Sequence, residues 1–188
     1  MKKLAMITLA AVLAVGLIGC SSKQKEYDEA IADFYIDSDT AFFFTALILD
    51  SYSSTWSTAI QKRNDFNAAL AKAVHDHQEM IEIVNQLKES LSEKLKVMSE
   101  AKNKDPEKYD EIYTVSKNVY SHLSSLIEQA NAPTGSLITF NANKKELAQN
   151  YKSERDILEA LLSDEVKQII EEKEKEKKKE TDKENSEE

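Results

Sequence analysis

Residues 27–52 read YDEAIADFYIDSDTAFFFTALILDSY, and this stretch decides the fold. It holds neither glycine nor proline, and its apolar or small side chains recur at alternating steps of four and three. That spacing places them on one face of a long helix. The series consists of Tyr27, Ile31, Phe34, Ser38, Ala41, Thr45, Ile48 and Tyr52. Trp56, Ala59 and Ile60 extend it.

The helix is expected to end at Asn64-Asp65, which offers a turn and an N-cap for the next helix. The serine-rich segment 51–57 is an alternative break. Trp56, the only tryptophan, lies near this far end. It is expected to pack the end of a core, with a role as a recognition anchor as the alternative.

The same stretch carries a second apolar stripe. Three consecutive phenylalanines, residues 42–44, turn through about 200° of helix, so one ring must leave the main face. Phe43 then points away from that face, together with Ile36 and Leu47. One interpretation is a central helix buried by neighbours on both sides. The other is a docking strip for a partner helix, a second copy or an apolar ligand.

Further along the chain, three more apolar series have helical spacing. They span residues 66–98, 109–130 and 140–169. Asp105-Pro106 is a strong helix start, with aspartate as the N-cap and proline in the first helical position. Residues 131–136 hold Pro133 and Gly135 and predict a turn. Ser136 or Asn143 is then expected to cap the last helix.

Together these series predict an all-α fold: an elongated up-down antiparallel bundle of four, or three, long helices. The chain has only three glycines and two prolines in 188 residues. That scarcity argues against folds rich in tight turns, which need positive or fixed φ angles at many points.

Upstream of the bundle, residues 1–3 form a short basic start, and residues 4–19 are almost entirely apolar. This run is shorter than the roughly 20 residues that a spanning helix needs, and it is typical of an export signal. It ends in Leu17, Ile18, Gly19 and Cys20, and Cys20 is the only cysteine. These residues resemble the lipobox of bacterial lipoproteins.

The resemblance implies that signal peptidase recognises Leu17, Ile18 and Gly19 and cleaves before Cys20, whose sulfur carries a diacylglyceryl group. The expected organisation is then a signal peptide at 1–19, a lipidated cysteine and short linker at 20–25, and a helical bundle at 26–170. Residues 171–188, of which fifteen are charged, form a largely disordered tail, whose start can extend the last helix through (i, i+4) charge pairs.

The charge balance constrains the partners. Without Lys2 and Lys3, 23 basic residues face 34 acidic residues. Anionic lipid headgroups and nucleic acid phosphates repel such a surface. Membrane attachment is therefore expected to come from the lipid on Cys20, and no nucleic acid partner is expected.

The sequence offers little for catalysis. The single cysteine is assigned to the lipid, and the chain has no Gly-x-Ser-x-Gly motif or phosphate-binding loop. His75 with Glu79, and Asp33 with Asp37, share helix faces, but two ligands make a poor metal site. His77 lies in an apolar series and is expected to be half-buried and hydrogen-bonded. We therefore expect no enzyme activity, no cofactor and no metal.

The function predicted from these observations is a lipid-anchored interaction or scaffold module on the outer face of the bacterial cytoplasmic membrane. In an organism with two membranes, the outer membrane is the expected location. The partner is another protein or a second copy of the chain, docking on Ile36, Phe43 and Leu47. The alternative is a lipoprotein that binds or senses a small apolar ligand between its helices.

Overall fold

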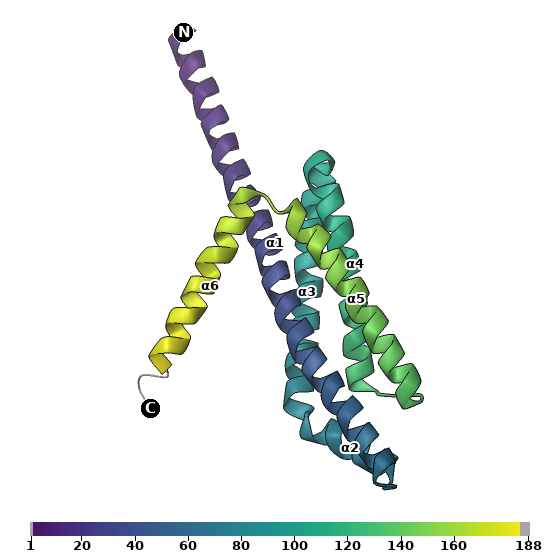
Figure 1. Ribbon diagram of the computed structural model, residues 1–188. Helices are drawn as coiled ribbons and strands as arrows, with labels where there is room; N and C mark the ends of the chain where they lie inside the picture. The colour runs from purple at the N-terminus through teal and green to yellow at the C-terminus, as the bar shows by residue number, and fades with distance from the viewer. Residues whose placement is uncertain (1, 185–188) are drawn as a thin grey trace.

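The computed structural model describes the backbone of residues 2–184, and the side chains from Lys23 to Glu176 and at Lys179. The described chain is entirely helical outside short connections, which confirms the predicted fold class (Figure 1). It forms six helices rather than four or three. They are α1 (Lys2–Gln61), α2 (Phe66–Asp76), α3 (Gln78–Lys104), α4 (Pro106–Asn131), α5 (Leu137–Leu161) and α6 (Asp164–Glu184).

Helix α1 is continuous, so the alternative break at residues 51–57 does not occur. The Ser53 hydroxyl donates to the Leu49 carbonyl one turn back, which satisfies it inside the helix. The chain reverses after Gln61, where Arg63 adopts a left-handed φ of 55°. Asp65 then caps α2 by accepting from the backbone N–H groups of Asn67 and Ala68, as the sequence predicts.

The second predicted helix is divided at His77, which separates α2 from α3. The His77 backbone leaves the helical region, with φ −104° and ψ 12°. Its imidazole Nε2 lies 2.7 Å from the Ser51 hydroxyl of α1. The expectation of a half-buried, hydrogen-bonded histidine is therefore confirmed, and this bond holds the break against α1.

The later helix starts follow the sequence closely. Asp105 accepts from the Lys108 N–H, and Pro106 occupies the first turn of α4. Gly135 has a φ of 90°, a conformation that other residues rarely adopt. Ser136 and Thr139 form a reciprocal capping box at the start of α5. Asn143, the alternative cap, lies inside that helix.

The end of the chain differs from the prediction in one way. The last helix is interrupted at Leu162-Ser163, and a new helix, α6, begins at Asp164. Helix α6 continues past residue 171 to Glu184, in keeping with the expected extension of the last helix into the charged tail. Two salt bridges involve this part of α6: Lys175 pairs with Glu171 within the helix, and Lys173 pairs with Asp33 of α1. Residues 185–188 lie outside the described residues.

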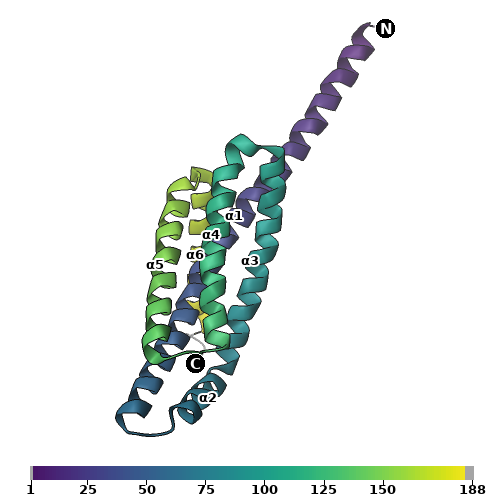
Figure 2. The ribbon, with the colours of Figure 1, turned by 90° about the vertical axis from the view of Figure 1, so that its right-hand side faces the viewer.

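Helices α1, α3, α4 and α5 lie side by side, and α6 contacts α1 (Figures 1 and 2). Helix α1 contacts all five other helices. Its predicted stripe is buried from Tyr27 to Trp56. Trp56 packs between Phe66 and Phe140, so it closes the far end of the core as expected.

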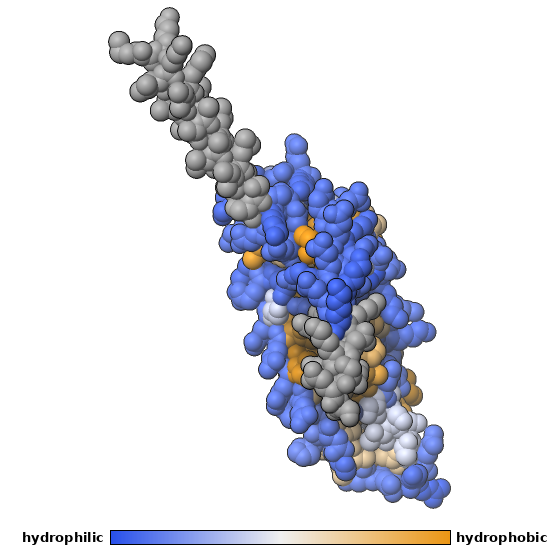
Figure 3. Space-filling model, turned by 90° about the vertical axis from the view of Figure 1, so that its left-hand side faces the viewer, coloured by the Kyte–Doolittle hydropathy of each residue, from blue (hydrophilic) through white to orange (hydrophobic). Residues whose placement is uncertain are grey.

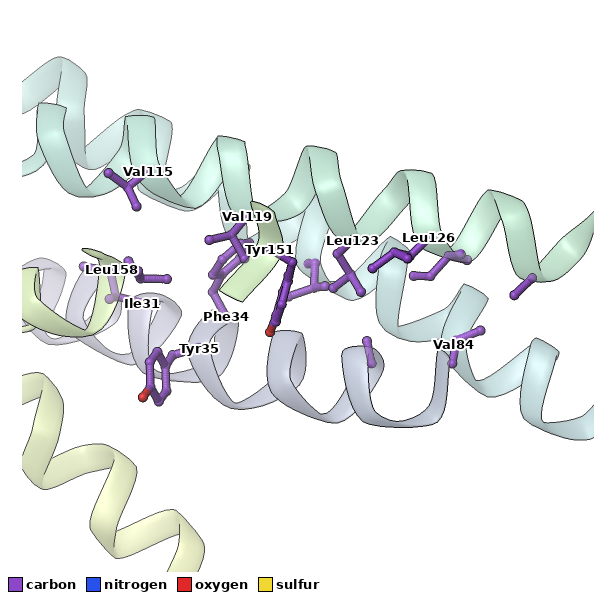
Figure 4. Close-up of a cluster of buried hydrophobic side chains, with 14 of the residues drawn as sticks. Ile31, Phe34, Tyr35, Val84, Val115, Val119, Leu123, Leu126, Tyr151 and Leu158 are labelled. Carbon is purple, nitrogen blue, oxygen red and sulfur yellow. The ribbon is translucent and has the colours of Figure 1, made fainter. Parts of the chain in front are cut away.

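Side chains of α1, α4 and α5 meet in the middle of this core, with Tyr151 among them and Tyr35 at its edge (Figure 4). Two polar members of the α1 stripe, Ser38 and Thr45, are fully buried. Their hydroxyls donate to backbone carbonyls of Tyr35 and Ala41, at 2.9 and 2.6 Å. These small, self-satisfied side chains let neighbouring helices approach α1 closely.

Candidate partner-docking face

The second stripe of α1 forms an outer face whose exposure changes along the helix. Its members follow helical steps of three and four: Ala32, Ile36, Asp39, Phe43 and Leu47. Ala32 is fully buried, Ile36 and Asp39 are half-buried, and Phe43 and Leu47 are 58% and 45% exposed. The same helix face is therefore covered at one end and bare at the other.

Helix α6 covers the near end. Val166 and Ile170 of α6 are buried, and the Lys173 Nζ lies 2.5 Å from the Asp33 carboxylate of α1. Beyond Ile170 the sequence of α6 contains no apolar side chain. Figure 1 shows the two helices diverging along their length.

The distal part of the face is aromatic and exposed. Phe43 makes an edge-on contact with Phe44, with ring centroids 5.5 Å apart. Figure 3, viewed from the α6 side, shows apolar surface among hydrophilic residues in the middle of the molecule. An exposed apolar patch rimmed by polar groups is typical of an interaction site. Ile36 differs from the other two predicted strip residues because it packs against the core.

A polar cluster that we call the α1–α5 clasp marks the border between the covered and bare parts. The Arg155 guanidinium of α5 binds both carboxylate oxygens of Asp39, with Nη2 2.7 Å from Oδ2. The Tyr151 hydroxyl donates to the same carboxylate at 2.9 Å. The Tyr35 hydroxyl donates to Glu159 at 3.1 Å, and Arg155 stacks 4.3 Å from the Tyr35 ring.

The clasp has a marked electrostatic character. Burial raises the pKa of the Tyr35 and Tyr151 phenols above their usual range, and nearby carboxylates add to the effect. Burial alone would lower the pKa of Arg155, but the bonds and charge of Asp39 more than offset it and raise that pKa. The clasp thus holds neutral phenols around a charged, bidentate ion pair.

The other charged candidates serve as links between helices. Asp33 pairs with Lys173, and Asp37 pairs with Lys94 of α3 at 3.0 Å. Among the residues that the structure describes, no group of three or more histidine, cysteine or acidic side chains is arranged to hold a metal ion.

The predicted lipid attachment site lies outside the described side chains. This applies to Leu17, Ile18, Gly19 and Cys20, whose backbone is part of α1. A search of the described residues finds no helix that is long and apolar enough to span a membrane.

Comparison with known proteins gives no relative. No protein-family model matches the chain, and no curated protein or solved structure is significantly similar to it. The function must therefore be argued from the surface itself.

Sequence reasoning placed Ile36, Phe43 and Leu47 on this face, of which Phe43 and Leu47 are exposed, and it missed the clasp. The available signal was Arg155, one of only two arginines in a lysine-rich chain. Arginine is favoured over lysine where a carboxylate is bound through two parallel hydrogen bonds.

Proposed function

We propose that this chain is a lipid-anchored protein of the bacterial cell envelope that presents the bare part of the α1 outer face to a protein partner. The observation that carries the proposal is the exposure of Phe43 and Leu47 on a helix that is otherwise packed on its other sides. Burying such side chains contributes about 1.5–3 kcal/mol each, so a partner gains substantially by covering them.

The proposed architecture is an elongated antiparallel bundle, with α1, α3, α4 and α5 running alternately up and down. Its anchor is the lipid on Cys20, and its location is the outer face of the cytoplasmic membrane. Phe43 lies twenty residues beyond Lys23 on one continuous helix. At about 1.5 Å per residue the docking face stands some 30 Å further from the anchor than Lys23 does.

The partner is expected to be a helix with an apolar face. Phe43 and Leu47 are four residues apart on a convex helix surface, which matches the i, i+4 anchors of helix-to-helix docking. The carboxylates of Asp39 and Asp50 flank these anchors, and each is already paired with a cation of α5, Arg155 and Lys144. The apolar anchors therefore carry the expected contact.

The anchor is tested with Cys20→Ser. If the cysteine carries the lipid, the variant accumulates with its signal uncleaved, and metabolic labelling with a radioactive fatty acid is lost. A wild-type protein that takes up no label would contradict the anchor, whatever the behaviour of the docking face.

The docking face is tested with a photo-crosslinking amino acid at Leu47 in living cells. A matched control carries it at Ile138, which is 82% exposed on α5. The proposal expects a discrete crosslinked band at position 47 that is absent at position 138 and disappears with Phe43→Asp. A product of twice the chain mass identifies a second copy, and any other discrete mass identifies a different protein. Equal crosslinking at both positions would overturn the docking face.

A further inference from the structure

A hollow of about 290 Å³ opens between α1 and α5, beside the α1–α5 clasp. Its floor is apolar and includes Leu49 of α1 and Leu126 of α4, both buried. Two alanines, Ala46 and Ala148, line it from the two facing helices. The volume falls near the lower end of the range for small-molecule pockets.

The hollow exists because the side chains around it are either small or held in contacts with other residues. Alanines occupy the positions where larger residues would close the gap between α1 and α5. Phe42, the nearest large side chain, stacks flat on Tyr151, with ring centroids 4.3 Å apart and an interplanar angle of 4°. This stacking holds the ring at the wall of the hollow.

The rim of the hollow is basic in an otherwise acidic protein. It carries Lys144, Lys145 and Lys152 against a single carboxylate, Asp50, whereas the whole chain has a net charge of −9. Lys144 is held by Asp50 at 2.7 Å and by the Ser53 hydroxyl at 3.1 Å. Lys152 lies over the Phe42 ring, 5.7 Å from its centroid. Lys145 and Lys152 therefore supply the positive charge beyond the Lys144–Asp50 pair.

We propose that this hollow binds a small amphiphilic carboxylate, a medium-chain fatty acid, with the alkyl tail on the apolar floor and the carboxylate on Lys145 and Lys152. An apolar floor with a cationic rim matches a molecule that has an apolar tail and one anionic end. A neutral alcohol of the same length lacks the charge that the lysines recognise. The proposal is independent of the anchor and of the docking face, and it gives the predicted apolar-ligand function a defined place.

The test uses the full chain in nanodiscs of zwitterionic lipid, with octanoate as the probe. Lysine acetylation rates are measured residue by residue by mass spectrometry. Octanoate is expected to slow the modification of Lys145 and Lys152 about tenfold at a concentration that occupies about 90% of the sites. Lys96, an exposed lysine of α3, serves as the internal control and keeps its rate.

Two comparisons decide the ligand class and its source. Octanol at equal concentration is expected to give no protection, because it lacks the carboxylate. Nanodiscs without octanoate report any protection by lipid acyl chains, and the proposal expects none. Protection that is equal with octanol, or already complete with lipid alone, would overturn the assignment to a free carboxylate.

Variants locate the site. Ala148→Leu fills the hollow and is expected to abolish protection, whereas Ala142→Leu, the same change at an exposed position of α5, retains it. Lys145→Gln leaves the hollow intact and is expected to raise the octanoate concentration for half-protection of Lys152 several-fold. The proposal fails if wild-type lysines are unprotected, or if Lys145→Gln and a folded Ala148→Leu both behave as wild type.

Discussion

The two ends of the α1 outer face share one sequence pattern and have opposite environments. Near Ala32 the face is buried under α6, and near Phe43 and Leu47 it is open. The exposure of the face changes because its covering helix, α6, has no apolar side chain beyond Ile170. Helix α1, in contrast, remains apolar for another two turns past Asp39. The difference teaches that the bare part is an apolar surface that the described side chains of α6 leave exposed.

Among the changes to the cover, the border and the bare part, Val166→Asp in the covering helix α6 is expected to have the largest effect. Val166 is buried, so the change places an unpaired charge in an apolar contact and lowers the free energy of unfolding by about 3 kcal/mol. Hydrogen exchange over α6 should rise sharply while α3 and α4 stay protected. The exposed neighbour Lys167→Asp is the control, and equal effects of the two changes would show that α6 is not held by apolar contact.

A smaller effect is expected at the border, from Arg155→Ala. The change removes the bidentate bonds to Asp39 and is expected to cost about 2 kcal/mol in chemical denaturation, within the range for hydrogen bonds to charged groups. Arg155→Lys should recover only part of this loss, because one ammonium does not reproduce the guanidinium fork. If Arg155→Lys recovers all of the lost stability, the positive charge alone accounts for the clasp, and the bidentate hydrogen bonds add nothing.

At high pH the ionisation of the clasp tyrosines is expected to lower the free energy of unfolding. The fall is about 1 kcal/mol per pH unit for each clasp tyrosine, beginning near pH 10. Burial raises the pKa of Tyr35 above its ordinary value of 10.0, so the unfolded chain loses this proton first. The free energy of unfolding is therefore unaffected by Tyr35 below pH 10 and falls as the pH rises above it. Tyr35→Phe should make the fall shallower, and an unchanged slope would contradict this account.

The smallest effect is expected on the bare part, from Leu47→Asp. Leu47 is exposed, so the free energy of unfolding should change by less than about 0.5 kcal/mol. Leu49→Asp, two residues further along the same helix and fully buried, should unfold the protein. If thermal denaturation shows that Leu47→Asp destabilises the protein as much as Leu49→Asp does, this part of the face is covered in the free protein. That result would contradict the contrast between its covered and bare parts.

Periodicity and helix caps were the reliable signals in the sequence. The α1 stripe, the caps at Asp65, Asp105 and Ser136, and the all-α class all follow from short-range chemistry, which one sequence displays. The breaks at His77 and Ser163 were missed because apolar spacing continues across both. His77 is held by Ser51, a contact that depends on the folded arrangement.

The candidate face was predictable only in part, for a related reason. The spacing of Phe43 and Leu47 reveals that they share a face, but exposure depends on where α6 lies. The clasp joins Asp39 to Arg155, 116 positions apart, and no local pattern reports such a pairing. Composition marks residues 171–188 as a charged tail, but it does not report the salt bridge between Lys173 and Asp33, 140 positions apart.

The continuity of α1 has a mechanical consequence. In the proposed arrangement one helix carries both the attachment point at Cys20 and the docking residues Phe43 and Leu47. A pulling force between membrane and partner then runs along the axis of a single helix and crosses no loop. The other five helices brace that helix from the sides. If the proposed anchor and partner are correct, tension between them loads α1 directly and does not first have to unfold the rest of the bundle.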